Sequence, residues 1–172
     1  MKLWDKGYDI DRFTEDTRLP GTDQRLQVSP TFSCNRAIPL SIVCRKAFKN
    51  SSTSFRILIG HPGAELRYIQ SESHQGLPVY KVHQDLLYSR LVFSDIDFSD
   101  IDVLFLCMGH GVSGKFLNVH PIPANVKIID LGNDFRLEKE SNGFIYGLPE
   151  LSREEIRKGR YVANPGCFAT AI

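Results

Sequence analysis

Cys167 is the residue of this chain best suited to covalent chemistry. It follows Asn164, Pro165 and Gly166, a sequence typical of a tight turn. If a helix begins at Phe168, its N–H groups and positive end lie beside the sulfur and favour the thiolate. A thiolate can attack an activated acyl carbon and hold the product as a thioester. The alternative is a small, buried apolar residue, and the spacing alone leaves both interpretations open.

The loop Gly109, His110 and Gly111 is a second candidate site. It follows the apolar run of residues 102–108, which is typical of a parallel strand buried on both faces. Ligands bind at the carboxyl ends of such strands, and the glycines would let a cofactor approach the backbone closely. His110 could act as a base, but a loop histidine is more often not catalytic. We therefore assign His110 to the cofactor pocket.

The cysteines as a group form no recognisable metal or disulfide pattern. The chain has 4 cysteines, and none of them belongs to a C-x-x-C pair. Widely spaced single cysteines favour neither a zinc site nor the disulfide framework of a small secreted protein. We therefore expect no bound metal and a separate role for each cysteine.

Strands and helices that would position these residues alternate along the chain. Apolar runs and loose alternation predict strands at 64–71, 102–108, 126–131 and 161–163, and helices at 112–119 and 152–159. Ser152 and Glu155 form a capping box for the last helix, and Gly159 fits its C′ position. Alternating strands and helices predict an α/β fold with a mostly parallel sheet.

Polar residues follow two of these strands. Ser71 and Ser73 lie where a Rossmann-type domain contacts the adenosine ribose, so their hydroxyls could meet a 2′-phosphate; a solvated polar loop is the alternative. Asp134 and Arg136 form a charged turn after residues 126–131. Arg136 could bind phosphate or carboxylate, but we expect a structural ion pair with Asp134.

The first strand and the glycine-rich loop that open a Rossmann-type unit are missing from the sequence. Such a unit opens with a strand and a G-x-G-x-x-G loop that admits the pyrophosphate to a helix N-terminus, and no such run occurs here. Residues 28–60 are instead basic and contain Ser, Pro and Asn, and only 55–59 looks like the tail of the expected helix. We expect a partial sheet that lacks the first strand and glycine loop, with a truncated second domain after Cys167.

The composition disfavours several classes of function. The chain is 42% hydrophobic and 24% charged, with 21 Lys and Arg against 20 Asp and Glu. At a formal net charge of +1, no global field draws it to nucleic acid or anionic lipid. No apolar run approaches the ~20 residues of a membrane span, and charge begins at Lys2. We expect a cytoplasmic protein with a small-molecule substrate and no nucleic-acid or membrane partner.

Four stretches carry a resemblance to a known family. Residues 102–111, 128–136, 146–151 and 163–170 resemble, in this order, N-acetyl-gamma-glutamyl-phosphate reductase of arginine biosynthesis. The resemblance runs from about His61 to the end and implies an NADP-binding Rossmann domain. It also implies that Cys167 attacks an acyl phosphate, that phosphate leaves, and that NADPH reduces the thioester to N-acetyl-glutamate semialdehyde. In the family a histidine of the second domain is the acid and base, and we expect a homo-oligomer of the intact protein.

The resemblance and the residue patterns together give one set of candidate cofactor-binding residues. These are Ser71, Ser73, Gly109, His110, Gly111, Asn164, Pro165 and Gly166. The single candidate catalytic residue is Cys167, and the cofactor is NADP. Because the family's histidine lies in a second domain, we expect little or no activity from this chain alone.

A second resemblance concerns the first 26 residues. Residues 1–8, 13–14 and 21–26 look like the N-terminus of argininosuccinate lyase, without any of the catalytic motifs of that enzyme. The sequence thus predicts three parts: a lyase-like segment at 1–27, a linker or unassigned segment at 28–60, and a partial NADP-binding domain at 61–172. Such a chain would be a joined or rearranged product.

Two alternative functions stay open. One is an inactive fragment that associates with an intact reductase subunit through an exposed sheet edge. The other is a reductase similar to aspartate-semialdehyde dehydrogenase, another enzyme that reduces an acyl phosphate. The cysteine motif of that family has Asn directly before the cysteine, whereas this chain has Gly166. Resemblance to aspartate-semialdehyde dehydrogenase therefore ranks well below resemblance to N-acetyl-gamma-glutamyl-phosphate reductase.

Overall fold

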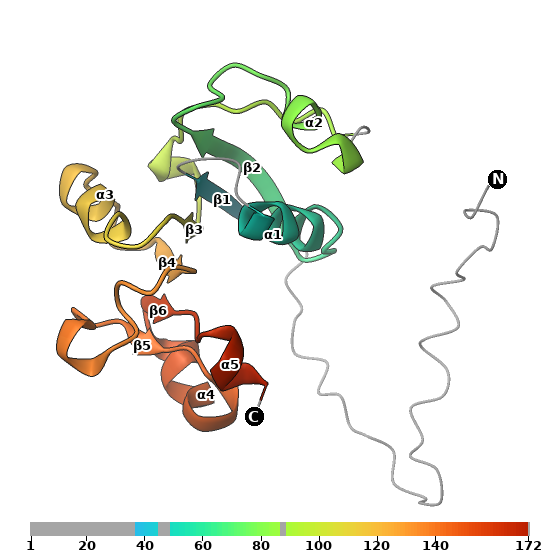
Figure 1. Ribbon diagram of the computed structural model, residues 1–172. Helices are drawn as coiled ribbons and strands as arrows, with labels where there is room; N and C mark the ends of the chain where they lie inside the picture. Colours follow the sequence, from blue (N-terminus) through green and yellow to red (C-terminus); the bar gives the residue numbers. More distant parts are fainter. Residues whose placement is uncertain (1–36, 45–48, 87–88, 172) are drawn as a thin grey trace, which may run out of the picture. The chain divides into compact units, whose positions relative to one another are not determined.

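The computed structural model describes residues 37–44, 49–86 and 89–171 (Figure 1). All of them fall within one structural unit, which runs from Arg36 to Ile172. The lyase-like segment at 1–27 lies outside the described residues, as does 28–36 of the expected linker.

A six-stranded parallel sheet forms the centre of this unit. Its strand order is β2-β1-β3-β4-β6-β5, and every pair of neighbouring strands is parallel. The strands are β1 (Ile38–Cys44), β2 (Ala64–Ser71), β3 (Val103–Cys107), β4 (Lys127–Asp130), β5 (Ile145–Tyr146) and β6 (Tyr161–Ala163). The predicted α/β fold with a Rossmann-type parallel sheet is confirmed.

The helices lie in the connections between strands. They are α1 (Lys49–Ile59), α2 (Val79–Val82), α3 (Ser113–Val119), α4 (Pro149–Lys158) and α5 (Cys167–Thr170), with 3-10 turns at Gln84–Leu86, Phe98–Asp100 and Glu138–Glu140. No helix among the described residues is long and apolar enough to cross a membrane.

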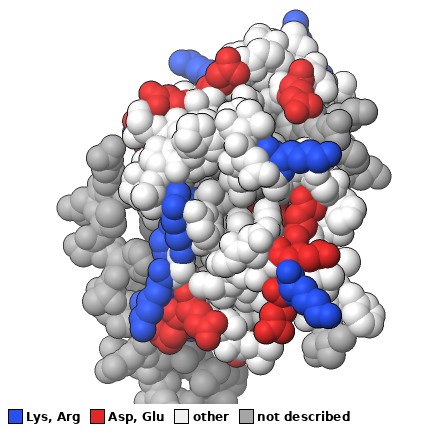
Figure 2. Space-filling view, turned by 90° about the vertical axis from the view of Figure 1, so that its left-hand side faces the viewer, with Lys and Arg blue, Asp and Glu red and all other residues white. Residues whose placement is uncertain are grey.

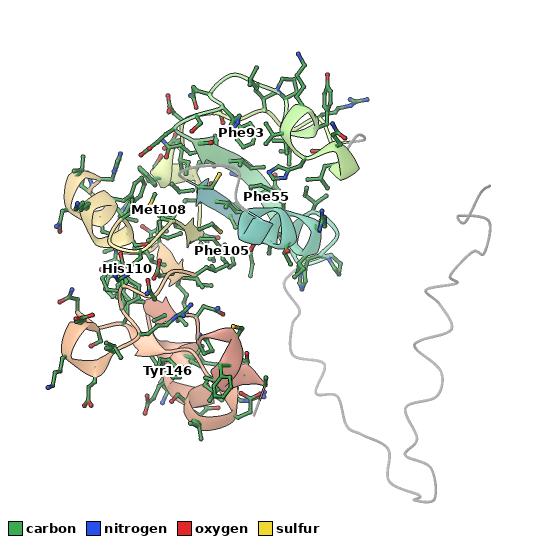
Figure 3. The ribbon with its side chains drawn as sticks, viewed as in Figure 1. Phe55, Phe93, Phe105, Met108, His110 and Tyr146 are labelled. Atoms are coloured by element: carbon green, nitrogen blue, oxygen red, sulfur yellow. The ribbon has the colours of Figure 1, made fainter. Side chains whose placement is uncertain are left out.

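Each face of the sheet has its own apolar core because neighbouring residues of a strand point to opposite faces. Ile42 and Cys107 pack with Phe55 of α1 on one face. Val43 and Leu106 lie on the other face, in the cluster against which Phe116 of α3 packs. Figure 1 shows α1 and α3 on opposite sides of the strands, and Figure 3 shows Phe55 beside Phe105 of β3. Covering both faces satisfies the general requirement of a parallel sheet.

The expected linker at 28–60 is wrong for residues 38–44 and 49–59, and so is the expected absence of a first strand. Ile38–Cys44 forms β1, which pairs with both β2 and β3 and is buried from Pro39 to Cys44. Pro39 and Ser41 interrupt the apolar run, and the first half of α1 is polar, so neither element shows the period that identifies it. Tertiary burial, rather than local pattern, makes these residues a strand and a helix.

The remaining predicted elements are present with small shifts. β2 matches the prediction, and β3, β4, α3 and β6 fall within or on the predicted ranges. α4 begins at Pro149, earlier than the capping box suggests, and Ser152 has a non-helical backbone inside it. Gly159 ends the helix with φ −69°, so it is not a left-handed C′ residue. Crowding favours glycine at this position, since a Cβ would collide with Ile145 Cδ1 and lie 3.0 Å from the backbone oxygen of Glu155.

The strand order places a topological switch point between β1 and β3. The chain passes from β1 outward to β2 and then returns to β3 on the other side of β1. At this edge, Cys44 is in register with Cys107, the last residues of the two strands. Crevices at such carboxyl ends bind ligands in doubly wound sheets, so this edge is the first place to look for a site.

Candidate dinucleotide-binding and catalytic site

Cys167 is exposed and begins α5. The helix therefore starts one residue earlier than expected, with Gly166 as its N-cap. Thr170 Oγ1 donates to the carbonyl of Cys167 at 2.9 Å and closes the short helix. The alternative of a small, buried apolar residue is wrong for Cys167, because its side chain is open to solvent. The first N–H groups of a helix have no partner within it, so α5 presents donors beside this sulfur.

Hydrogen bonds from β4 and its loop fix the turn before Cys167. The backbone N–H of Asn164 donates to the carbonyl of Asp130 at 2.8 Å. Arg136 Nε donates to the carbonyl of Asn164 at 2.8 Å, and its Nη2 donates to the carbonyl of Leu131 at 3.2 Å. The expected ion pair with Asp134 is wrong, because the Arg136 guanidinium reaches backbone carbonyls instead. Arg136 thus ties the end of β4 to the cysteine turn.

Asp134 instead organises the loop after β3. Its carboxylate accepts hydrogen bonds from the N–H of Gly111 at 2.6 Å and of Ser113 at 3.1 Å. His110 Nδ1 lies 2.7 Å from Asn133 Oδ1 and 3.2 Å from Asp134 Oδ1, and the His110 side chain is 76% exposed. The negative charge of Asp134 is favourable at the start of α3, because the first N–H groups of a helix have no partner within the helix. No local pattern predicts these partners of Asp134.

Asp130, the last residue of β4, is a buried acid that the sequence pattern does not single out. It lies between the loop after β3 and the segment before Cys167. Its Oδ1 accepts from Ser113 Oγ at 2.6 Å, and Oδ2 has no hydrogen-bond partner among the described residues. Burial raises the pKa of Asp130, and the hydrogen bond from Ser113 opposes that rise. A Cβ at Gly132 would lie 3.1 Å from Oδ2, so only glycine fits comfortably there.

The two glycines after β3 have different reasons to be glycine. Gly111 has φ +73°, in the left-handed region that favours glycine. At Gly109 a Cβ would meet no atom within 4 Å, so the space beside this residue is open.

The sulfurs at the nearby strand ends are buried, and burial raises the pKa of Cys44 to about 11 and of Cys107 to about 12. Neither of these two thiols is a nucleophile candidate.

A cavity of about 320 Å³ opens at the ends of β2 and β3. Glu72 follows β2, Met108 follows β3, and α3 supplies most of the other wall. The full lining is Glu72, Met108, Val112, Lys115, Phe116, Val119 and His120. Figure 3 labels Met108 on the side of α3. Neither Ser71 nor Ser73 lines the cavity; Ser71 is buried, with its Oγ 3.3 Å from His74 Nδ1.

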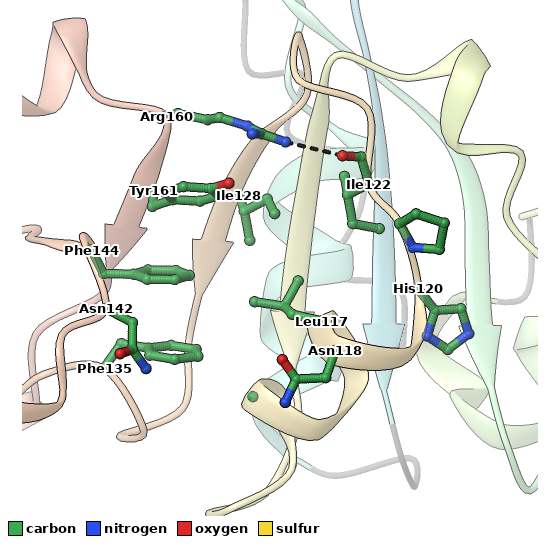
Figure 4. Close-up of a pocket in the computed structure, with 12 residues that line it drawn as sticks. Leu117, Asn118, His120, Ile122, Ile128, Phe135, Asn142, Phe144, Arg160 and Tyr161 are labelled. Atoms are coloured by element: carbon green, nitrogen blue, oxygen red, sulfur yellow. Dashed lines mark hydrogen bonds between the residues drawn. The ribbon is translucent and has the colours of Figure 1, made fainter.

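A larger hollow of about 520 Å³ lies between α3 and the β4–β6 half of the sheet (Figure 4). The rings of Phe135 and Phe144 stack 4.0 Å apart, and Phe144 also stacks on Tyr161 at 5.1 Å. Arg160 lies 4.8 Å over the Tyr161 ring and donates to the Ile122 carbonyl at 3.1 Å. This guanidinium is therefore bound to the protein itself.

The charged side chains on one face of the molecule are mixed. Figure 2 shows acidic and basic side chains beside one another around an uncharged centre. Among the described residues, Arg67 pairs with Asp100 and Glu65, and Arg157 pairs with Glu154 at 3.4 Å. The described residues also contain no group of three or more His, Cys, Asp or Glu that could hold a metal ion.

A parallel sheet with this switch point and an open glycine loop at its carboxyl end is typical of a dinucleotide-binding α/β domain. Residues 52–159 match the family described as semialdehyde dehydrogenase, NAD binding domain. The chain belongs to this family.

The curated relatives extend this result. The chain is 44% identical over 118 residues to N-acetyl-gamma-glutamyl-phosphate reductase of Christiangramia forsetii, covering 68% of this chain and 37% of the relative. It is 49% identical over 119 residues to the enzyme of that name from Parabacteroides distasonis, with the same coverage. The predicted resemblance is confirmed, and the chain spans little more than a third of these relatives.

One solved structure shares the fold. It is aspartate semialdehyde dehydrogenase II from Vibrio cholerae, described as complexed with ASA, which superimposes with a TM-score of 0.56 at 17% identity. The match covers 77% of this chain and 43% of that one. At this identity the likeness supports the fold and nothing finer.

Proposed function

We propose that this chain is the dinucleotide-binding part of a reductase that converts N-acetyl-gamma-glutamyl phosphate to N-acetyl-glutamate semialdehyde through a thioester on Cys167. The observation that carries the proposal is the loop after β4. Through Arg136 it holds the cysteine turn, and through Asp134 it holds the Gly109–Gly111 loop. Both loops follow parallel strands, so a thiol and an open glycine loop share one edge of the sheet.

The residues present fit a nicotinamide dinucleotide at two places. The space beside Gly109 is open, and the cavity lined by Glu72 and Met108 lies at the ends of β2 and β3. When bound, the nicotinamide supplies the hydride that reduces a thioester to an aldehyde. The sequence between Ile38 and Ile59 contains no glycine, so the first turn has no glycine cradle for a pyrophosphate. We therefore expect weaker binding than in a domain with that cradle.

The chemistry assigned to this chain's own residues centres on Cys167. As thiolate, its sulfur forms a bond to the acyl carbon of the substrate, and the carbon–oxygen bond to phosphate breaks. The N–H groups at the start of α5 can stabilise the oxyanion of the tetrahedral intermediate. Arg136 keeps Asn164–Gly166 in place while the acyl group is held, and Asn164, Pro165 and Gly166 bring the thiol beside the nicotinamide.

The coenzyme, the location, the oligomeric state and the substrate are predictions from the sequence. NADP is implied by the family resemblance, and the hydroxyls of Ser71 and Ser73 would suit its 2′-phosphate, but neither side chain lines the cavity at the end of β2. The choice of NADP over NAD therefore stays a prediction. A cytoplasmic location, a homo-oligomer and a small acyl-phosphate substrate remain predictions.

An inactive chain that associates with an intact reductase subunit is the second candidate. Association through the β2 edge is less favoured than the sequence suggested. Phe93 bridges to Ile69 of β2, and Ser94 N–H donates to the Ile69 carbonyl at 2.9 Å, so part of that edge is occupied.

Acylation of the thiol tests the proposed function without requiring turnover. The full chain is incubated with acetyl phosphate as a simple acyl-phosphate probe and examined by intact mass and peptide mapping. We expect one acetyl thioester, on Cys167, that hydroxylamine removes and that Cys167→Ser lacks. Acylation of lysines alone, or none at Cys167 in a chain shown by circular dichroism to be folded, would contradict the proposal.

A further inference from the structure

Asp130 is a buried carboxyl group that the chemistry proposed for Cys167 does not use. It is the last residue of β4, and its exposed fraction is 0%. Ser113, the first residue of α3, is buried to the same extent, and its hydroxyl donates to Asp130 Oδ1 at 2.6 Å. Burial of a carboxyl group costs free energy that one hydrogen bond offsets only in part. A carboxyl kept here is therefore a candidate for a role beyond packing.

Ser113 lies at the downstream end of the Gly109–Gly111 loop, separated from it by Val112. His110 and Gly111 are exposed, whereas Ser113 is fully buried. The loop therefore runs from the end of β3 through solvent and returns to the protein interior at Ser113. The hydrogen bond to Asp130 fixes this return point to the centre of the sheet.

The main chain of Asp130 contacts the other loop of the candidate site. Its carbonyl accepts a hydrogen bond at 2.8 Å from the N–H of Asn164, which opens the turn before Cys167. β4 lies between β3 and β6, and Asp130 is in register with Leu106 and Ala163 of these strands. Asp130 is thus bonded to one loop through its side chain and to the other through its backbone.

A second Ser–Asp hydrogen bond of the same length lies on the surface of the described structure. Ser99 Oγ donates to Asp97 Oδ1 at 2.6 Å, and both residues are exposed. This bond joins residues two apart in a 3-10 turn, whereas the Ser113–Asp130 bond joins residues seventeen apart in two elements. The surface bond therefore provides a matched control for the buried one.

We propose that Asp130 is a positioning residue for the dinucleotide: through Ser113, its carboxyl holds the Gly109–Gly111 loop in place relative to the cysteine turn. The inference rests on the proposed function, because the loop and the turn belong to the site proposed there. Without this bond the loop loses its anchor, so a dinucleotide has to order the loop when it binds. Ordering a loop on binding lowers the affinity.

Binding of reduced dinucleotides to the full 172-residue chain tests this role. Dissociation constants for NADPH and NADH are measured by nicotinamide fluorescence at one pH and one salt concentration. Ser113→Ala removes the donor and Asp130→Leu removes the acceptor. We expect each change to weaken binding about tenfold, the scale of one hydrogen bond to a carboxyl group. Asp130→Asn keeps an acceptor oxygen for Ser113, so its affinity should stay within about threefold of the native value.

A double variant distinguishes loss of one shared bond from two independent effects. Ser113→Ala combined with Asp130→Leu should bind no more weakly than Asp130→Leu alone, because both changes break the same bond. Ser99→Ala breaks the matched surface bond and should leave both dissociation constants unchanged. Circular dichroism shows whether each variant is folded. If Asp130→Leu unfolds, Ser113→Ala and Asp130→Asn decide the matter, since each changes a single polar atom.

Amide hydrogen exchange without dinucleotide gives a second readout. In Ser113→Ala, exchange should rise in the Gly109–Gly111 loop and at Asn164, while β2 keeps its native protection. Asp130→Asn should restore the protection of both loops. A residue that only stabilises the fold as a whole would raise exchange in all strands alike.

The outcomes distinguish failure of this inference from failure of the proposed function. Native affinity in folded Ser113→Ala, or a loss in Asp130→Asn as large as in Ser113→Ala, would overturn the role of Asp130 and leave the reductase proposal standing. The same holds for exchange in Ser113→Ala that rises equally in all strands or not at all. Binding of neither dinucleotide by the folded native chain, even at millimolar concentration, would overturn both.

Discussion

Arg136 and Asn164 are joined by a hydrogen bond of 2.8 Å from the guanidinium Nε to the backbone carbonyl. This bond connects the loop after β4 to the turn that presents Cys167. The same guanidinium reaches the Leu131 carbonyl, so one side chain spans the ends of two neighbouring strands. The position of the thiol therefore depends on a residue that is distant in sequence.

Replacing Arg136 by Met should loosen the cysteine turn. We expect a loss of about 1 kcal/mol in the free energy of unfolding, because the Asn164 and Leu131 carbonyls lose the guanidinium donor and water replaces it only in part. Amide hydrogen exchange should rise at 164–167 more than in β3. Arg136→Lys should restore part of the protection, since it keeps a donor. Exchange that rises equally in all strands would show that Arg136 only stabilises the fold as a whole.

Gly109 and Gly111 form a matched pair of substitutions. Gly111→Ala should lower stability by about 1 kcal/mol because of its left-handed backbone, φ +73°. Gly109→Ala should leave stability nearly unchanged, because its Cβ would meet no atom, but should weaken dinucleotide binding by filling that space. Thermal unfolding and NADH titration measure the two effects. A Gly109→Ala variant that binds NADH as the native chain does would place the dinucleotide elsewhere.

The buried carboxyl of Asp130 predicts a pH dependence of stability. Burial raises its folded pKa above the ordinary value of 3.8, so folding favours the protonated form. Its contribution is fully present below that ordinary value and is lost as pH rises through the raised folded pKa. Asp130→Asn should therefore gain stability relative to the native chain as pH increases from 4 toward neutrality.

Urea unfolding of both proteins across this pH range measures the difference. Asp95→Asn, on the surface, is the control and should show no such divergence. Parallel stability curves for the native chain and Asp130→Asn would mean that the carboxyl is hydrated rather than buried.

The assignment of residues 38–44 as a central strand can be tested with Ile42, which is fully buried. Ile42→Ala should cost about 2–4 kcal/mol, the usual effect of a large cavity in a core. In a linker the same change would alter stability by less than about 0.5 kcal/mol. Chemical unfolding decides between these values, with Ile57→Ala, at 62% exposure, as the control.

Local pattern was sufficient for much of this fold. The apolar run of residues 102–108 predicted β3, and Asn164, Pro165 and Gly166 predicted the break between β6 and the segment that begins at Cys167. β1 was missed because Pro39 and Ser41 break its apolar run, although both are buried. Its identity comes from pairing with β2 and β3, which no local window contains.

The contacts of the candidate site were harder to predict because they join distant segments. Asp134 was paired with its sequence neighbour Arg136, whereas each of them bonds to a loop more than twenty residues away. Glu72 lines a cavity only because α3 lies beside the end of β2, which no local pattern shows. Charge and residue type identify candidates, and the topology of the sheet selects their partners.

Alkylation tests most directly whether Cys167 is an accessible thiol beside a bound dinucleotide. Iodoacetamide at neutral pH is followed by peptide mass spectrometry with and without saturating NADH. Cys44 and Cys107, whose burial raises their pKa to about 11 and about 12, are internal controls that should react only in urea. We predict that Cys167 reacts before Cys44 and Cys107 and that NADH slows it several-fold. A Cys167 rate unaffected by bound NADH, or a Cys167 that reacts only in urea, would contradict the account.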